Sequence, residues 1–280
     1  MGKFLFYDND GTLVGMTIIV TEKTKQAIKQ AQENGHKAFL CTGRAPTSIV
    51  GDILDIGFDG IVCSAGGFVI VDGEYIFENL MNQYVLSEVM TLFINNQVLF
   101  TLETKDAIYE TPGVSEFFDR KWLNENKDNL ELMRFFQLRK QGENRLPIRE
   151  FEILKTGVTK VCFIAPKKEN FYRCEKFLED FFNIVIFSKD TDEFVNGEII
   201  LKNCTKADGI IKVVNHFRGK MEDTIGFGDS MNDYQMIEEA NIGVVYENAP
   251  QQLKDIAQYY FKDPDDDGIY EVMKELQLID

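Results

Sequence analysis

The segment Phe4–Tyr7 is a run of four apolar residues that stops abruptly at Asp8-Asn9-Asp10-Gly11-Thr12. Such a run is typical of a short strand buried on both faces of a parallel sheet. Carboxylates are costly to bury unless they are paired or bind a metal, so we expect both aspartates at the carboxyl end of the strand, where open parallel sheets bind ligands. Gly11 permits a turn that brings the two acids together. An ordinary Asp-Gly turn is the alternative interpretation.

A helix and a second strand follow. Residues 22–34 carry apolar side chains on one face behind Thr21, which has the side chain of a helix N-cap. Residues 37–41 form another apolar strand, which ends in Thr42-Gly43-Arg44. The two strands of such a unit are parallel, so their polar ends lie at one edge of the sheet. We therefore expect Asp8 and Thr42 to be neighbours in space.

Further elements extend this first pattern. A helix is expected over residues 46–55 and a strand over 60–64. Asp72-Gly73, between apolar segments at 68–71 and 75–77, is a strong signal for a two-residue hairpin. We expect this hairpin to be the exit from the first domain.

The middle of the chain, about residues 83–187, differs in composition and pattern. It has basic clusters and several phenylalanines but no predicted strand that ends in acidic residues. We expect helices and strands in an order that predicts an α+β insert with its own sheet, the helices at 86–95, 117–129 and 171–181 and the strands at 98–103, 107–110 and 160–164. Residues 138–147, with Arg139, Lys140 and Arg145, are predicted to form an exposed loop, the alternative being an edge that faces the substrate.

After the insert the first pattern resumes. Thr205 and Asp208 have the spacing of a capping box, which places Lys206 at the first position of a helix. A strand at 224–227 then ends in Gly228-Asp229-Ser230-Met231-Asn232-Asp233. The remaining expected elements are a strand at 241–245, a helix at 251–259, an acidic loop at 263–268 and a helix at 269–276.

Composition excludes several classes of function. The net charge of −16 over 280 residues argues against a surface for nucleic acid or anionic membrane, and no apolar run approaches the roughly 20 residues that span a bilayer. Two histidines are too few for a histidine-rich zinc site. Five cysteines without CxxC spacing, and no signal sequence, predict free thiols in a reducing cytoplasm.

The polar strand ends together indicate a chemistry. The carboxylates expected at this edge are Asp8, Asp10, Asp229 and Asp233. Carboxylates without histidine or cysteine favour Mg²⁺, while Thr42, Lys206 and Asn232 supply a hydroxyl, an ammonium and an amide for phosphate oxygens. Asp8 would attack phosphorus as a nucleophile, and Asp10 would protonate the leaving alcohol and then deprotonate the hydrolytic water.

At these residues the chain resembles the Cof-type phosphatases of the haloacid dehalogenase (HAD) superfamily. Four motifs match in order, namely Asp8-Asn9-Asp10-Gly11-Thr12, Thr42-Gly43-Arg44, Lys206 and the segment from Gly228 to Asp233. The resemblance covers nearly the whole chain. It implies an α/β fold in which residues 1–82 and 188–280 form a Rossmann-like three-layer core with a parallel sheet, and residues 83–187 form an inserted α+β cap.

The resemblance also implies roles for single residues. Asp8 is the nucleophile and Asp10 the general acid and base. Mg²⁺ is held by the Asp8 carboxylate, the Asp10 backbone carbonyl and Asp229, with Asp233 as a ligand or just behind the ligands. The residues implied for phosphate and substrate are Asn9 through its backbone, Thr42, Gly43, Arg44, Lys206 and Asn232. For Arg44 the alternatives are a structural ion pair and a contact that faces the cap.

Each residue also has a plainer interpretation when taken alone. Lys206 would be an exposed lysine on a first helical turn, and Thr42 a helix cap. Cys41 and Cys63 are expected in the core. The acidic run at 265–267 reads as a solvated turn, since it lacks the ligand spacing of an EF-hand.

Two departures from the family pattern stand out. Ala65-Gly66 occupies a place where the family often has Asn-Gly, so an amide that could touch substrate is missing. Asn9 replaces the apolar residue that usually separates the two aspartates. Its backbone N–H remains available, so we expect no loss of chemistry.

The prediction is a Mg²⁺-dependent phosphatase that acts on small phosphorylated metabolites, such as sugar phosphates or phosphorylated cofactors, through an aspartyl-phosphate. We expect a monomer or weak homodimer. The alternatives are a phosphomutase or other phosphotransferase, and a non-catalytic regulatory protein that binds a metabolite. A dehalogenase is disfavoured because it would not need the acid cluster.

Overall fold

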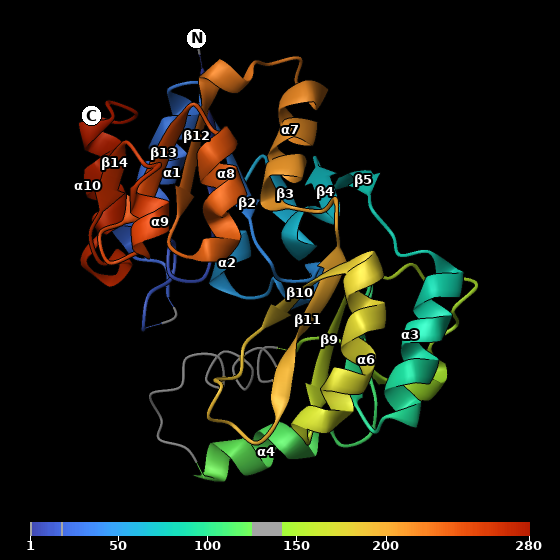
Figure 1. Cartoon of the computed structure of the whole chain (residues 1–280). Coiled ribbons are helices and arrows are strands. Elements are labelled where there is room, and N and C mark those ends of the chain that lie inside the picture. The colour runs from blue at the N-terminus through green and yellow to red at the C-terminus, as the bar shows by residue number, and fades with distance from the viewer. Residues whose placement is uncertain (1, 18, 125–141) are drawn as a thin grey trace. The chain divides into compact units, whose positions relative to one another are not determined.

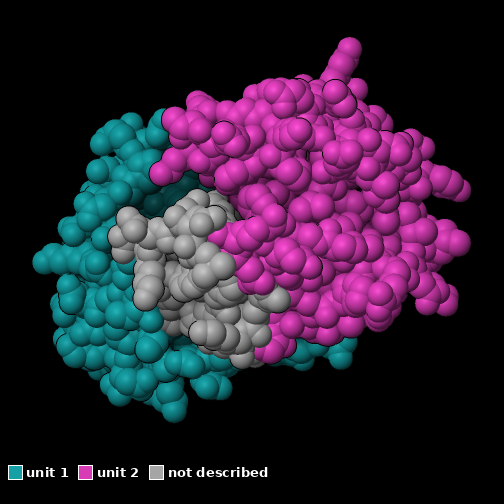
Figure 2. Space-filling view, turned by 90° about the horizontal axis from the view of Figure 1, so that it is seen from below, with its two compact units in different colours: residues 1–44, 49–78, 204–280 teal, residues 45–48, 79–203 magenta. Residues whose placement is uncertain are grey.

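The computed structural model describes residues 2–17, 19–124 and 142–280 (Figure 1). Its contacts divide the chain into two units, which Figure 2 shows in different colours. The first unit comprises residues 1–44, 49–78 and 204–280, and the insert unit comprises residues 45–48 and 79–203. Both units are mixed α/β.

The first unit contains a mostly parallel sheet. Within the described residues it has eight strands in the order β14-β13-β12-β1-β2-β3-β4-β5. Six of them are parallel: β1 (Phe4–Tyr7), β2 (Lys37–Cys41), β3 (Gly60–Cys63), β12 (Thr224–Gly228), β13 (Ile242–Tyr246) and β14 (Tyr259–Phe261). Because β12, β1 and β2 are adjacent, the polar segments behind them meet at one edge, as predicted.

Helices cover both faces of this sheet, which gives the expected three layers. Leu5 and Tyr7 of β1 pack with α1 (Glu22–Glu33) and α10 (Gly268–Glu275), while Phe6 packs on the opposite face with α7 (Lys206–His216) and α8 (Tyr234–Glu239). The alternation of side chains along a strand produces these two faces.

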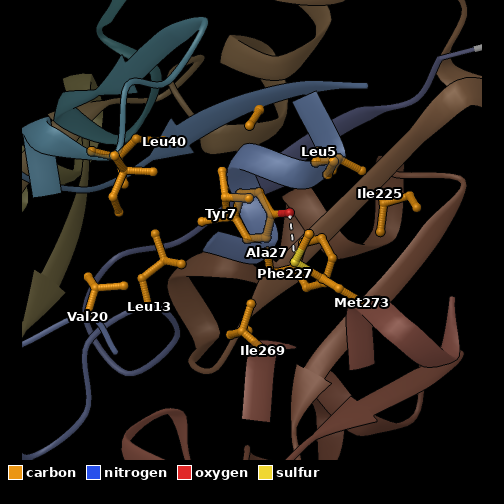
Figure 3. Packing of buried hydrophobic residues seen from close by; sticks show 14 of the residues in the cluster. Leu5, Tyr7, Leu13, Val20, Ala27, Leu40, Ile225, Phe227, Ile269 and Met273 are labelled. Carbon is orange, nitrogen blue, oxygen red and sulfur yellow. Dashed lines mark hydrogen bonds between the residues drawn. The ribbon is translucent and has the colours of Figure 1, made fainter. Parts of the chain in front are cut away.

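The face that carries Tyr7 is tightly filled (Figure 3). The Tyr7 ring stacks on Phe227 with 4.4 Å between centroids, and its hydroxyl donates to the Met273 sulfur at 3.4 Å. Burial raises the pKa of the Tyr7 phenol, so this group stays neutral. The apolar layer thus supports the strand that ends at Asp8.

The predicted helix starts are confirmed. The Thr21 side chain accepts from the N–H of Thr24 at the start of α1. Thr205 and Asp208 form a reciprocal capping box, and Lys206 is the first residue of α7. Both caps satisfy backbone donors that a helix start leaves without partners.

The predicted hairpin is also present. It joins β4 (Phe68–Val71) and β5 (Glu74–Glu78), which pair antiparallel. Asp72 and Gly73 both have positive φ, 51° and 79°, as the tight turn between twisted strands requires.

Two predicted helices are wrong in extent. Residues 46–55 form a short 3₁₀ turn at Pro46–Ser48 and a helix, α2 (Asp52–Asp55), because Gly51 breaks the segment with a φ of 78°. The helix expected at 251–259 ends early, as α9 (Gln251–Lys254). Residues 255–258 form a turn and a bend, and Tyr259 begins β14, which pairs with β13.

The insert unit has its own sheet, as expected. Its strand order among the described residues is β10-β11-β9-β6-β7-β8. The strands are β6 (Leu99–Glu103), β7 (Ile108–Glu110), β8 (Arg145–Pro147), β9 (Lys160–Ala165), β10 (Phe182–Ile186) and β11 (Val195–Leu201). Side chains of α3 (Gln83–Asn95) and α6 (Lys168–Phe181) form one apolar cluster with β6, β9 and β11.

The insert extends further than the expected residues 83–187. Besides residues 45–48, it runs from Asn79 to Asn203. Its later end lies beyond residue 187 because β11 pairs with both β9 and β10 and therefore belongs to this sheet. Arg145, expected in a loop, lies in β8, which pairs with β7. The expected helix at 117–129 corresponds to α4 (Val114–Asn124). Its remaining residues, with Arg139 and Lys140, lie outside the described residues.

A buried ion cluster joins the central strands of the insert. Lys160 Nζ lies 3.2 Å from Glu103 Oε2 and 2.9 Å from Glu198 Oε2. Burial works against the charge of Lys160, but the two glutamates raise its pKa well above the ordinary value.

Among the helices that the structure describes, none is long and apolar enough to cross a membrane.

Candidate active site

The loop after β1 is built around the backbone of Asn9. The Asn9 carbonyl accepts from the N–H groups of Thr12, Leu13 and Val14 at 3.4, 3.0 and 2.9 Å. Gly11 has a φ of 101°, and a Cβ there would lie 2.2 Å from Asp229 Oδ2. Glycine is therefore required at position 11 both for the turn and for the approach of the Asp229 carboxylate.

Three of the four predicted acids form one close group. Asp8, Asp229 and Asp233 each offer a carboxylate oxygen, and these oxygens lie within 4.8 Å of one another. Asp8 and Asp233 are buried, and the Thr12 hydroxyl donates to Asp229 Oδ1 at 3.2 Å. Loops from β1 and β12, which are neighbours in the sheet, supply the group.

Lys206 lies inside this group. Its Nζ is 2.5 Å from Asp8 Oδ1, 2.5 Å from Asp233 Oδ1 and 3.3 Å from Asn232 Oδ1. Burial alone would lower its pKa, but Asp233 and Asp8 raise it instead. The lysine is only 1% exposed, so the interpretation of an exposed helical lysine is wrong. Its place at the start of α7 aims the ammonium at the ends of β1 and β12.

Asp233 organises the loop that carries Asp229. Its Oδ2 accepts from the backbone N–H groups of Asp229 and Ser230 at 3.0 and 3.1 Å, and its Oδ1 faces Lys206. A carboxylate oxygen can accept more than one bond, so these contacts leave room for a cation. Asp233 therefore holds both the loop and the lysine in place.

The group carries a surplus of negative charge. Burial, and then Asp233, raise the pKa of Asp8 well above its ordinary value, against the opposing effect of Lys206. Burial and Asp233 likewise raise the pKa of Asp229 to about 6. One lysine thus does not compensate three clustered acids. The donors are all oxygen, as hard divalent cations prefer, so the residues present fit Mg²⁺.

The Asp10 carboxylate has a different partner. Arg44 Nε donates to Asp10 Oδ2 at 2.8 Å and Arg44 Nη2 donates to Oδ1 at 2.6 Å, a two-point contact. Among the described residues, the close acid group consists of Asp8, Asp229 and Asp233. The metal contact expected of Asp10 is through its backbone carbonyl and stays a prediction.

The second strand brings Thr42 and Gly43 to the same edge. The Thr42 hydroxyl accepts from the N–H of Arg44 at 3.1 Å, so it acts as a local cap and can still donate. A Cβ at Gly43 would meet no atom within 4 Å, so space is open beside this backbone. The Thr42 carbonyl accepts from Ala65 N–H at 3.1 Å, which ties this loop to the end of β3.

Some residues of the site had no predicted role. Thr12, within the first motif, bonds Asp229, and Ser230 donates to Asn232 Oδ1 at 3.0 Å and forms a capping box with Asp233. The spacing of Ser230 and Asp233 was the available signal. Ser64 and Ala65 have left-handed φ values of 48° and 54°. No sequence signal marks this bend, since neither residue favours that conformation.

Comparison with known proteins gives a consistent result. A model of the haloacid dehalogenase-like hydrolases matches residues 5–273. The chain is 27% identical to YkrA of Bacillus subtilis over 284 residues, which cover 99% of this chain and 98% of YkrA. It is 24% identical to the HMP-PP phosphatase of Yersinia enterocolitica over 266 residues, with 91% and 87% covered.

Solved structures share the fold. The HAD subclass IIB sugar phosphatase BT4131 superposes with a TM-score of 0.75 at 24% identity, over 99% of this chain and 100% of that one. The sequence match spans nearly all of the described chain, including every residue of the site. The protein therefore belongs to the family of haloacid dehalogenase-like hydrolases.

Proposed function

We propose that this protein is a Mg²⁺-dependent phosphatase that hydrolyses small phosphorylated metabolites through an aspartyl-phosphate on Asp8. The observation that carries the proposal is the buried contact between Lys206 and Asp8 beside the acids Asp229 and Asp233. A nucleophilic carboxylate, a fixed ammonium and a site for a divalent cation are the groups that phosphoryl transfer requires.

The cation would be held by the carboxylates of Asp8 and Asp229 and by the backbone carbonyl of Asp10, with Asp233 beside them. When bound, Mg²⁺ supplies positive charge that offsets the charge of the phosphoryl group. The raised pKa values of Asp8 and Asp229 support this assignment, because a cation removes the repulsion that contributes to them.

The residues of the chain then carry the reaction in two steps. An Asp8 oxygen attacks phosphorus while the bond to the leaving oxygen breaks, and Asp10 gives that oxygen a proton. Asp10 next takes a proton from water as this water attacks the phosphorus of the aspartyl-phosphate. Inorganic phosphate leaves and the Asp8 carboxylate is restored. Lys206, fixed on Asp8, stabilises the negative charge in both steps.

The phosphate group would be oriented by donors at the same edge of the sheet. These are the ammonium of Lys206, the Asn232 amide, the Thr42 hydroxyl and the backbone N–H groups of Gly43 and Asn9. The open space beside Gly43 supports an approach of substrate to this backbone.

The relatives support the substrate class. They include the HMP-PP phosphatase of Yersinia enterocolitica and a 5-amino-6-(5-phospho-D-ribitylamino)uracil phosphatase of Bacillus subtilis, YwtE. We therefore propose a sugar phosphate or a phosphorylated cofactor or precursor as substrate. The five free cysteines support the expected reducing, cytoplasmic location.

The test is release of inorganic phosphate from a panel of phosphorylated metabolites, with Mg²⁺ and with EDTA, for the wild type and for Asp8→Asn. We expect turnover that needs Mg²⁺ and falls at least about 10³-fold in the variant. Asp180→Asn, an exposed acid on α6, is the matched control and should retain full activity. Turnover that is independent of metal, or that survives Asp8→Asn, would contradict the proposal.

A further inference from the structure

The guanidinium of Arg44 forms a two-point ion pair with the Asp10 carboxylate. Two parallel bonds, of 2.8 Å from Nε and 2.6 Å from Nη2, engage both carboxylate oxygens. The side chains of Arg44 and Asp10 are only 14% and 21% exposed. Planar two-point pairs of this kind define a direction as well as an attraction.

Asn9 completes the arrangement. In the amide orientation that satisfies both groups, its side-chain oxygen accepts from Arg44 Nη2 and Nε, each at 3.2 Å. The same edge of the Arg44 guanidinium therefore contacts both Asn9 and Asp10, which are adjacent in the first motif. This explains why a polar Asn9 replaces the apolar residue that the family pattern usually has between Asp8 and Asp10.

The backbone of Arg44 is fixed as well. Its N–H donates to Thr42 Oγ1 at 3.1 Å, and its carbonyl accepts from Ser64 N–H at 2.7 Å. The side chain thus starts from a point held by β2 and by the end of β3. Because its backbone is fixed and its planar guanidinium contacts Asp10 at two points, Arg44 can set the direction of the Asp10 carboxylate.

We propose that Arg44 is a positioning residue for Asp10, an inference that rests on the proposed phosphatase function. A carboxylate has about four lone-pair sites, so Asp10 can accept from Arg44 and still bind a proton. The protonated acid gives this proton to the leaving oxygen, and the carboxylate then takes one from water. Arg44 holds that free site of the carboxylate toward the leaving oxygen and later toward the water. An arginine that binds phosphate uses this same two-point edge, and here the edge holds Asp10.

The dependence of the rate on the leaving group tests this role. The probes are p-nitrophenyl phosphate, whose leaving group needs little protonation, and the best alkyl phosphate of the metabolite panel. For Arg44→Ala we expect kcat/KM to fall about 10²-fold or more with the alkyl phosphate and less than about 10-fold with the aryl one. A phosphate ligand would lower both values equally and would raise KM.

A double-mutant cycle gives a second readout. If Arg44 acts through Asp10, then Arg44→Ala added to Asp10→Asn should cost less than about threefold further in kcat/KM. Guanidinium ion should restore part of the activity of Arg44→Ala but none of Asp10→Asn. Arg173→Ala, an exposed arginine on α6, is the matched control. Arg44→Lys replaces Arg44→Ala if the latter does not fold, with the same pattern expected because lysine lacks the planar fork.

The outcomes separate the two proposals. Two results with an active wild type would overturn the positioning role and leave the phosphatase proposal standing. In the first, Arg44→Ala lowers kcat/KM equally for both substrates. In the second, the fold-losses of Arg44→Ala and Asp10→Asn multiply in the double mutant. A folded wild type that hydrolyses neither probe overturns the phosphatase function and the positioning role with it.

Discussion

The Nζ of Lys206 lies 2.5 Å from Oδ1 of Asp8, although 198 positions separate the two residues in the sequence. The capping box of α7 fixes Lys206 at the first helical position. The parallel sheet fixes Asp8 directly after β1, beside β12. Because Lys206 and Asp8 are both buried, removing one charge leaves the other without compensation.

Lys206→Met should therefore destabilise the metal-free protein by about 3–5 kcal/mol, since Asp8 and Asp233 remain buried without their cation. Urea denaturation in EDTA measures this loss. Lys212→Met changes an exposed lysine on the same helix, whose Nζ lies 4.7 Å from the centroid of the Phe77 ring, and should stay within about 1 kcal/mol of the wild type. Equal stability of the two variants would mean that Lys206 does not compensate these acids.

The acid group predicts an unusual dependence of stability on pH. Asp229 has a folded pKa of about 6, above the unfolded value near 3.9. The folded state therefore binds this proton more tightly, and the free energy of unfolding falls as pH rises from about 4 to about 6. The raised pKa of Asp8 acts in the same direction. The expected loss from Asp229 is on the order of 2 kcal/mol.

Denaturation in EDTA across this pH range measures the effect. Asp229→Asn should remove the part of the slope that this residue causes, whereas Asp180→Asn, an exposed acid, should leave the slope unchanged. Excess Mg²⁺ should reverse the trend for the wild type, because the cation binds the ionised carboxylates. A wild-type slope that survives Asp229→Asn in full would contradict the assignment.

The sequence predicted the polar edge well because topology decides it. Adjacent parallel strands place their ends together whatever the intervening residues do, so the convergence of the loops after β1 and β2 followed from short apolar runs. The burial of Lys206 could not follow from its helix alone. It depends on the strand order, which brings Asp8 and Asp233 to the same point.

The features that the sequence did not predict have local physical causes. Strand β11 was not predicted because it includes Asn196 and Gly197, residue types that are depleted in strands. Strand β14 begins at Tyr259, the last residue of the expected helix, and forms because β13 offers an edge to pair with. The pairing of Arg44 with Asp10 rests on side-chain geometry, which spacing in the sequence does not encode.

Gly11→Ala should disrupt the acid group specifically. Its Cβ would lie 2.2 Å from Asp229 Oδ2, so the carboxylate must move. Gly35→Ala is a close control, because Gly35 also has a positive φ, 90°, but a Cβ there meets nothing within 4 Å. Both variants should lose about 1–2 kcal/mol from backbone strain. Only Gly11→Ala should also weaken Mg²⁺ binding, by about tenfold or more, as calorimetry would show.

Ala65→Asn should stabilise the protein. Ala65 has φ 54° and ψ 35°, a left-handed conformation that costs most residues about 1–2 kcal/mol and asparagine less. We expect a gain of up to about 1 kcal/mol in the free energy of unfolding, measured by urea denaturation. Ala65→Val provides the opposite case, because a branched Cβ is least compatible with this conformation, and it should lose about 1–2 kcal/mol. A loss for asparagine as large as that for valine would show that space around the side chain, rather than backbone strain, limits position 65.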